Sequence, residues 1–298
     1  MSRFLFFFLI LGGCHGVPSP FCAQVKTQVP IASGTHVYSE TKNLKLDLRL
    51  PEHPQTRTPG VIFVHGGGFQ MGRRDSEIVC SFLDDLSRAG IASASISYRL
   101  TRKEKGFGCD VPVEEKQAAV QAAGEDLMQA LSWLELHCLN GPDTWVAAGS
   151  SAGAETALWA GYVAHPDRWA GVLSLSGALD SRTKVAADAP PLFAAHGVCD
   201  AVVPARHDVH RDCPLDSKGA WDLLGGLAWA DSLRASGVQA TTWKKCQGGH
   251  EVCNTAMMNP NVREKILMWL TQLGSNQNQD WSDSHPGKGP HPCPSPCH

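Results

Sequence analysis

The chain has 298 residues, with 26 Lys and Arg against 29 Asp and Glu and a formal net charge of −3. Hydrophobic residues make up 43% of it and charged residues 18%. This ordinary globular composition excludes a disordered or fibrous chain. Because there is no excess of basic residues, nucleic acid is not an expected partner.

The N-terminus has the pattern of an export signal. A positive charge at Arg3 precedes an unbroken apolar run from Phe4 to Leu11. A membrane-spanning helix needs roughly 20 apolar residues, so this run predicts a signal peptide and no stable membrane span. We expect residues 1–16 to be removed, with a second cleavage site after Ala23. The predicted localisation is therefore secreted.

Cysteine usage supports export. Leu11-Gly12-Gly13-Cys14 also fits a bacterial lipoprotein box, so a lipid anchor at Cys14 is an alternative. Loss or lipidation of Cys14 leaves an even number of cysteines, as a disulfide framework requires. These ten are Cys22, Cys80, Cys109, Cys138, Cys199, Cys213, Cys246, Cys253, Cys293 and Cys297. We expect at least three bridges, including one at Cys199, Cys246 or Cys253, and a link from Cys213 that ties down residues 206–218.

Apolar segments of two periodicities follow one another along the chain. Strands are predicted at 44–50, 61–64, 91–98, 144–148, 171–175, 191–195 and 239–245. Helices are predicted at 78–89, 114–138, 152–164, 219–235 and 262–273. Alternation of strands and helices predicts an α/β fold with a mostly parallel central sheet flanked by helices. The catalytic domain is expected to span 35–273, and the Asn, Gln, Pro and His composition of 274–298 predicts a disordered tail.

A nucleophile motif lies between a predicted strand and a predicted helix. Gly149-Ser150-Ser151-Ala152-Gly153 fits G-x-S-x-G with Ser151 at its centre. In this motif a sharp strand-to-helix turn exposes the serine hydroxyl above the sheet, and small neighbours allow the turn to close. The pattern therefore predicts Ser151, and not Ser150, as the nucleophile.

A second glycine-rich motif follows the strand that ends at Val64. His65-Gly66-Gly67-Gly68 fits the HGGG oxyanion pattern of lipases and esterases. No Lys-Ser/Thr pair follows it, which excludes a Walker phosphate loop. We expect the backbone N–H groups of Gly67, Gly68 and Ala152 to form the oxyanion hole, and His65 to have a structural role.

The acid and base of such a site follow the serine in the order Asp or Glu, then His. His250 lies between the predicted strand 239–245 and the last helix, so it is the predicted base. Asp200 follows the strand 191–195 and is the predicted acid. Asp180, after the strand 171–175, is the alternative acid.

Five motifs in order resemble one known superfamily. They are His65 to Phe69, Tyr98-Arg99-Leu100, Gly149 to Gly153, His196-Gly197 with Asp200 and Val203-Pro204, and Gly249-His250. Together they look like an α/β-hydrolase esterase over about residues 40–273. Tyr-Arg-Leu is shared with hormone-sensitive-lipase-like esterases, but Thr101-Arg102-Lys103 departs from their Ala-Pro-Glu. The acid segment is more similar to secreted feruloyl-esterase-like and dipeptidyl-peptidase-like branches.

The predicted function is a serine carboxylic-ester hydrolase that works through an acyl-enzyme and needs no cofactor or metal. Only about 15 residues separate the strands 171–175 and 191–195, where many esterases carry a cap domain, so little or no cap is expected. An open pocket suits a bulky or polysaccharide-linked ester. The alternatives are a serine peptidase and a non-catalytic binding protein on the same fold.

Overall fold

A computed structural model describes residues 31–55, 57–273 and 278–283. The predicted signal peptide, the cleavage sites, Cys14, Cys22, Cys293 and Cys297 lie outside these ranges. In the described part of the chain, no helix combines the length and apolar character needed to cross a membrane.

The main sheet has nine strands in the order β1-β2-β4-β3-β5-β6-β8-β11-β12. The β1–β2 and β2–β4 pairs are antiparallel, and every pair from β4–β3 to β11–β12 is parallel. Its strands are β1 Gly34–Ser39, β2 Leu44–Arg49, β3 Gly60–Val64, β4 Ser93–Ile96, β5 Trp145–Ser150, β6 Gly171–Leu175, β8 Leu192–Gly197, β11 Ala240–Lys245 and β12 Gln279–Asp283. This is the mostly parallel sheet that the alternation of elements predicted.

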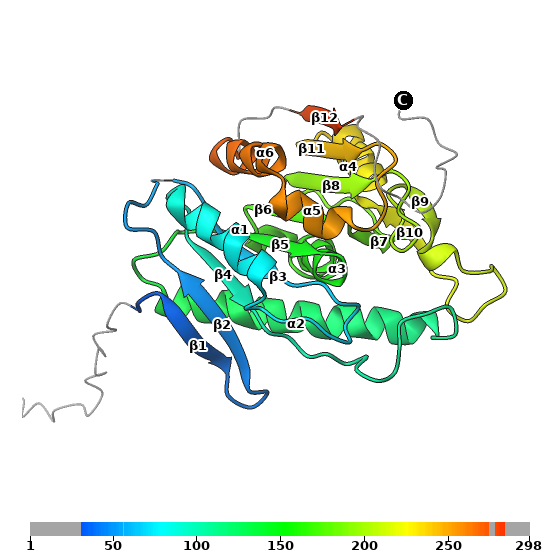
Figure 1. Cartoon of the computed structure of the whole chain (residues 1–298), viewed down its shortest axis with the longest axis horizontal. Coiled ribbons are helices and arrows are strands. Elements are labelled where there is room, and N and C mark those ends of the chain that lie inside the picture. Colours follow the sequence, from blue (N-terminus) through cyan, green and yellow to red (C-terminus); the bar gives the residue numbers. More distant parts are fainter. Residues whose placement is uncertain (1–30, 56, 274–277, 284–298) are drawn as a thin grey trace, which may run out of the picture.

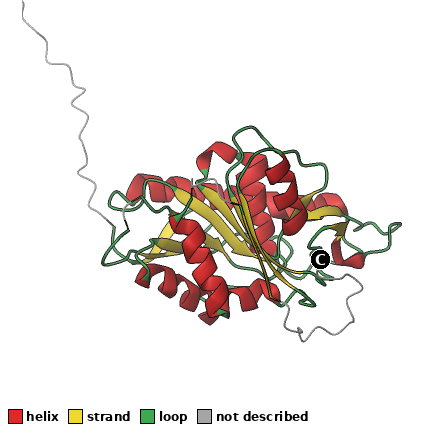
Figure 2. Cartoon of the chain, turned by 90° about the horizontal axis from the view of Figure 1, so that it is seen from above, coloured by secondary structure: helices red, strands yellow, loops and turns green. Residues whose placement is uncertain are grey.

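Helices cover both faces of this sheet (Figures 1 and 2). Their bounds are α1 Glu77–Arg88, α2 Val113–His137, α3 Ala152–Trp159, α4 Gly226–Ala235, α5 Val252–Met258 and α6 Pro260–Thr271. Apolar residues of α2, α3 and α4 belong to one core cluster, and those of α1, α5 and α6 to the other. The sheet therefore separates two hydrophobic cores.

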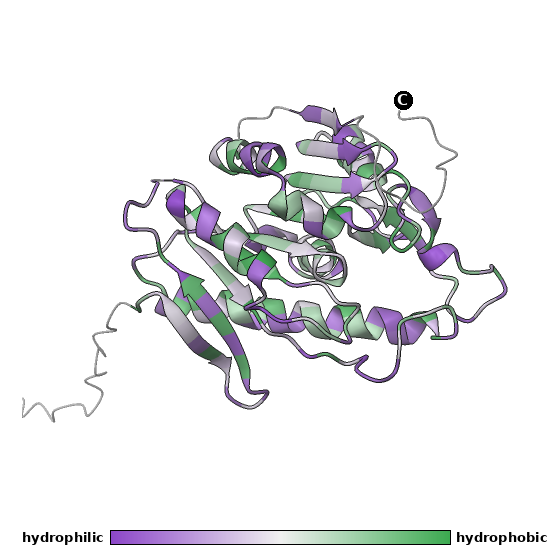
Figure 3. Ribbon diagram, viewed as in Figure 1, coloured by the Kyte–Doolittle hydropathy of each residue, from purple (hydrophilic) through white to green (hydrophobic). Residues whose placement is uncertain are grey.

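Strand β3 shows how the sequence produces this layering. All five of its residues are buried. Ile62 and Val64 pack in one core, while Val61 and Phe63 pack in the other, because successive side chains of a strand point to opposite faces. Strand β2, near the sheet edge, instead alternates buried leucines with half-buried polar residues. Figure 3 shows the matching alternation of hydrophobic and hydrophilic residues.

A second, three-stranded sheet flanks the carboxyl edge of the first. It has the order β7-β10-β9, formed by β7 Ala178–Asp180, β9 His207–Val209 and β10 Asp222–Gly225, with antiparallel pairing throughout. The connection from β6 to β8 contributes β7 to this sheet and holds no separate domain, in keeping with the expected lack of a cap.

Two sequence predictions are wrong in this part of the chain. The helix expected over 219–235 begins only at Gly226, because residues 222–225 pair with β7 and β9 as a strand. The tail expected to be disordered from 274 contains β12, which pairs with β11 in parallel. In both places the hydrogen-bond partners are distant in sequence, so local periodicity does not reveal them.

Candidate active site

Ser151 lies on a strained turn between β5 and α3. Its backbone has φ 52° and ψ −122°, a region of positive φ that non-glycine residues rarely occupy. The turn needs small neighbours: a Cβ at Gly149 would lie 2.2 Å from the Gly153 carbonyl oxygen, and one at Gly153 would lie 2.0 Å from that of Val64. The Ser151 amide donates to the Leu175 carbonyl oxygen at 2.8 Å, which ties the turn to β6.

The structure brings the predicted serine, histidine and aspartate together. The Ser151 hydroxyl oxygen lies 2.8 Å from Nε2 of His250, and His250 Nδ1 lies 2.8 Å from Oδ2 of Asp200. The three residues follow β5, β8 and β11, whose carboxyl ends meet at one edge of the sheet. With Asp200 ionised, His250 donates from Nδ1 and leaves Nε2 to accept the serine proton.

Asp200 is held as a buried carboxylate. Its Oδ1 accepts hydrogen bonds from the amides of Val202 and Val203, each at 2.9 Å, and its side chain is fully buried. Burial opposes ionisation, but the hydrogen bonds of His196 and His250 outweigh it and hold the pKa of Asp200 well below its usual value. His196 Nε2 lies 3.4 Å from Oδ2 and 3.0 Å from the Val203 carbonyl oxygen.

The glycine-rich segment lies beside the serine in a cavity of about 560 Å³, which Gly66, Gly67, Gly68, Ser151 and His250 help to line. Gly67 and Gly68 have φ of +115° and +61°, and a Cβ at Gly67 would lie 2.1 Å from a backbone oxygen. Among the described residues, the amides of Gly67, Gly68 and Ala152 donate no hydrogen bond. Ala152 itself does not line the cavity.

His65 has the structural role that the sequence indicated. Its Nδ1 lies 2.7 Å from the Gly66 carbonyl oxygen, and its ring packs on Tyr98 with centroids 4.5 Å apart. The Tyr98 hydroxyl donates to the His65 carbonyl oxygen at 2.9 Å. Tyr98, from the Tyr-Arg-Leu motif, therefore supports the segment that precedes the three glycines.

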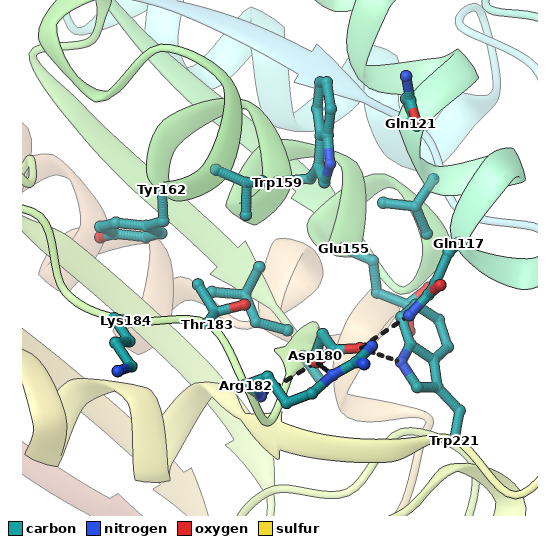
Figure 4. A pocket seen from close by; sticks show the side chains of 14 residues that line it. Gln117, Gln121, Glu155, Trp159, Tyr162, Asp180, Arg182, Thr183, Lys184 and Trp221 are labelled. Carbon is teal, nitrogen blue, oxygen red and sulfur yellow. Dashed lines mark hydrogen bonds and ion pairs between the residues drawn. The ribbon is translucent and has the colours of Figure 1, made fainter. Parts of the chain in front are cut away.

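Asp180, the alternative acid, lies in a different cavity. This second cavity, of about 610 Å³, shares no lining residue with the first. The Asp180 carboxylate accepts hydrogen bonds from Gln117, Arg182 and the Trp221 indole, as Figure 4 shows. These donors, Arg182 foremost, hold the pKa of Asp180 well below its usual value. The structure therefore pairs Asp180 with these three residues and pairs Asp200 with His250.

Sequence patterns missed a group of buried ionisable residues beside the site. Glu155, one turn after Ser151, is 2% exposed with one carboxyl oxygen unpartnered, and burial raises its pKa to about 8. Burial and the nearby Arg211 lower the pKa of Lys116 to about 8; its ammonium group contacts His210 Nδ1 at 3.0 Å and the Gly219 carbonyl oxygen at 2.7 Å. These contacts join residues that are far apart in sequence, so no local motif marks them.

The cysteine predictions are confirmed in part. Cys213 is bonded to Cys109 across a sequence separation of 104 residues. Cys199 and Cys246 are also disulfide-bonded. Cys253, expected as an alternative partner beside His250, is a buried free thiol, and Cys80 and Cys138 are free as well. The expectation of at least three bridges stays a prediction.

Comparison with known proteins agrees with the fold described above. Residues 46–177 match the family model BD-FAE. Two structures of an esterase from Thermogutta terrifontis, one with butyrate bound and one phosphoramylated by tabun, superpose with TM-scores of 0.57 and 0.56 at 18% identity. They cover 81% of this chain and 94% and 95% of theirs. The chain has the α/β-hydrolase fold.

A curated relative of this chain is "Probable carboxylesterase 1" of Arabidopsis thaliana, 28% identical over 144 residues. The match covers 43% of this chain and 41% of the relative's length. The relationship therefore concerns about two fifths of each protein.

Proposed function

We propose that this α/β-hydrolase is a serine carboxylesterase. The observation that carries the proposal is the continuous hydrogen-bond chain from Ser151 through His250 to Asp200, with 2.8 Å at each step. A serine hydroxyl is a weak nucleophile unless an oriented base accepts its proton, and this chain supplies that base. The named esterase and carboxylesterase relatives support the same reaction class.

The proposed reaction has two steps. Ser151 Oγ attacks the ester carbonyl carbon while His250 Nε2 takes the hydroxyl proton; the alcohol leaves with that proton, and an acyl-enzyme remains. Water then attacks the acyl carbonyl carbon while His250 takes its proton; the bond to Ser151 Oγ breaks, His250 returns the proton to Oγ, and the carboxylic acid leaves. Asp200 stabilises the His250 imidazolium in both steps, and the amides of Gly67, Gly68 and Ala152 stabilise the oxyanion.

For the substrate, we propose a bulky ester, including one linked to a polysaccharide. The connection from β6 to β8 supports this, because in the described chain it only adds β7 to the small sheet and forms no separate cap. A panel of p-nitrophenyl esters of increasing acyl length, with feruloyl and acetylated-sugar esters, measures this preference. Rates that fall to zero for every ester larger than acetate would contradict the proposed open site.

The test of the mechanism is a matched pair of serine variants. Ser151→Ala should lower kcat by several orders of magnitude with the fold intact, because triad members act as a unit. Ser150→Ala, next to it, should have a small effect. A fluorophosphonate probe should label the wild type and not Ser151→Ala. Loss of activity only in Ser150→Ala, or peptide cleavage without ester cleavage, would contradict the assignment.

We further propose that the protein is exported. The apolar run after Arg3 and the Cys109–Cys213 bridge support this, because disulfides persist mainly in oxidising compartments. Non-reducing peptide mapping of protein recovered from its native host should find the Cys109–Cys213 peptide pair and a mature N-terminus near residue 17. Free thiols at both positions would contradict export.

A further inference from the structure

The catalytic cavity has an unbalanced charge. Among the described residues that line it, two are arginines, Arg73 and Arg211, and none is an aspartate or glutamate. Arg73 is neutralised, since its guanidinium group makes two hydrogen bonds of 2.8 Å to the carboxylate of Asp75. Arg211 makes no ion pair with any described carboxylate. The described part of the cavity therefore presents one exposed, uncompensated guanidinium group.

The backbone holds Arg211 in an unfavourable conformation. Its φ of 60° and ψ of 28° lie in the left-handed region, where an arginine is strained and glycine or asparagine would be relaxed. Its amide donates to the carbonyl oxygen of Val202, two residues beyond Asp200, at 3.0 Å. Strained non-glycine residues persist where the surrounding structure fixes them, and they cluster at ligand-binding positions.

A disulfide and hydrogen bonds keep this segment in place beside Asp200. Cys213 is bonded to Cys109, and its amide donates to the His210 carbonyl oxygen at 3.3 Å. The His210 amide in turn donates to the Trp221 carbonyl oxygen at 2.9 Å. Arg211 thus lies on a loop that a disulfide and hydrogen bonds hold to the body of the domain, which is the support that a binding residue needs.

Nearby ionisable groups leave the Arg211 guanidinium group without an ion pair in the described part of the chain. Glu155 is buried with a raised pKa of about 8, so it is largely uncharged at neutral pH. Lys116 adds positive charge, while Asp200 is a carboxylate whose hydrogen bonds come from His196, His250 and two backbone amides. An anion that enters the cavity can therefore pair with the Arg211 guanidinium group, which lines the cavity together with Ser151 and is held in no ion pair with a described carboxylate.

We propose that Arg211 is a specificity residue that binds a carboxylate group of the ester substrate, at a distance from the ester bond that Ser151 attacks. A guanidinium group matches a carboxylate in two parallel hydrogen bonds, which gives orientation as well as attraction. The carboxylate belongs either to the acyl part, as in a half-ester of a dicarboxylic acid, or to the alcohol part, as in an ester of a carboxylate-bearing sugar or phenol. The inference rests on the proposed esterase function.

Two substrate pairs separate these sources. On the alcohol side, 4-carboxyphenyl acetate is compared with neutral 4-carbamoylphenyl acetate; on the acyl side, the p-nitrophenyl half-ester of glutaric acid is compared with p-nitrophenyl valerate. The quantity measured is the ratio of kcat/KM for the anionic ester over the neutral one. Intrinsic differences in reactivity between the two esters cancel when this ratio is compared between wild type and variant.

The variants are Arg211→Asn, which is neutral and tolerates the left-handed backbone, and Arg211→Lys, which keeps the charge without the planar fork. In one of the two pairs, Arg211→Asn should lower the anionic-over-neutral ratio by about tenfold at low ionic strength. Arg211→Lys should fall between wild type and Arg211→Asn. The matched control is Arg206→Gln on the same loop, which removes one exposed positive charge outside the cavity.

The wild-type protein gives a test that needs no variant: the ratio should decline as NaCl is raised, because an exposed charge is screened. Equal loss on anionic and neutral esters in Arg211→Asn, or the same change in Arg206→Gln, would overturn the inference and leave the esterase function standing. A change of the ratio by no more than about twofold in every variant is the effect expected of a surface charge that does not bind the substrate. This result would also overturn the inference and leave the esterase function standing. Failure to hydrolyse any ester would overturn both proposals.

Discussion

Two aspartates that the sequence left as alternative acids have different physical roles. Asp200 is fully buried and oriented toward His250, whereas Asp180 is enclosed by Arg182, Gln117 and Trp221 in the second cavity. Both carboxylates have pKa values well below the usual range. A lowered pKa alone therefore does not distinguish the two candidates, and the proposal of Asp200 as the catalytic acid rests on its hydrogen bond to His250.

The first prediction compares the two amide variants. Asp200→Asn should leave the fold intact and lower kcat by about 10⁴-fold, because an amide at this position favours the wrong His250 tautomer. Asp180→Asn should keep kcat within a few-fold and lower stability by about 1–2 kcal/mol, since it weakens the Arg182 and Trp221 hydrogen bonds. Steady-state kinetics and urea unfolding measure both; a dead Asp180→Asn with an active Asp200→Asn would reverse the assignment.

The second prediction concerns the pH dependence of stability at Glu155. Its folded pKa of about 8 exceeds the unfolded value of about 4.3, so between these limits the folded state holds a proton that the unfolded state has lost. Stability contributed by this proton is fully present at low pH and is lost as pH rises toward 8. Glu155→Gln removes the titration, so the variant should gain on the wild type as pH increases.

Thermal unfolding from about pH 5 to pH 8 measures this gain, which should approach about 1.4 kcal/mol per pH unit. Comparison of the two proteins at each pH removes the larger part of the contributions from His210 and Lys116, whose folded pKa values are lowered to about 3 and about 8. Glu114→Gln, at the start of α2, is the control and should track the wild type. Parallel curves for wild type and Glu155→Gln would contradict a buried, protonated Glu155.

At the scale of elements, the sequence predicted those strands, turns and helices whose formation depends on neighbouring residues. The glycines of Gly149–Gly153 and the flanking apolar runs predicted the strand, the turn and the helix that present Ser151, because close backbone approach excludes a Cβ at Gly149 and Gly153. For residues 222–225 the sequence predicts a helix, whereas the structure has a strand. This strand forms by pairing with β7 and β9, and the local sequence does not reveal such pairing. The position of Arg211 in the cavity escaped prediction for the same reason.

The third prediction concerns the bridge that anchors the Arg211 loop. Cys109 and Cys213 are 104 residues apart, and a closed loop of about this length contributes about 4–5 kcal/mol in the chain-entropy model. The double variant Cys109→Ser with Cys213→Ser should lose stability of that order in urea unfolding. Cys80→Ser, which removes a free thiol, is the matched control and should lose little. An unchanged unfolding midpoint in the double variant would show that other contacts hold the loop.

At the scale of the molecule, the last strand of the main sheet is β12, which the composition of the sequence did not predict. β12 pairs along most of β11, and Asp280 accepts hydrogen bonds from Thr242 and Arg234. Trp281 packs against Phe193, and Lys265 Nζ lies 4.8 Å from the centroid of the Trp281 ring. Polar Asn and Gln residues around it gave no apolar run, so the sequence indicated the core of the sheet and missed its last strand.

The fourth prediction compares two truncations. A chain that ends at Leu273 lacks β12 and exposes the edge of β11, so it should lose about 2 kcal/mol or more and aggregate more readily. A chain that ends at Asp283 keeps β12 and should behave like the full chain in both respects. Thermal unfolding and light scattering at matched concentration measure the difference. Equal stability of the two truncations would show that β12 adds nothing to the sheet.

The free thiol of Cys253 should determine how this protein responds to reagents that inactivate cysteine hydrolases. Cys253 lines the catalytic cavity, and its amide donates to the His250 carbonyl oxygen at 3.1 Å. Burial raises its pKa to about 12, so the reactive thiolate form is scarce at neutral pH. If Ser151 is the nucleophile, iodoacetamide and maleimides should therefore leave the activity intact and phosphonates should abolish it, although Cys253 and Ser151 line the same cavity.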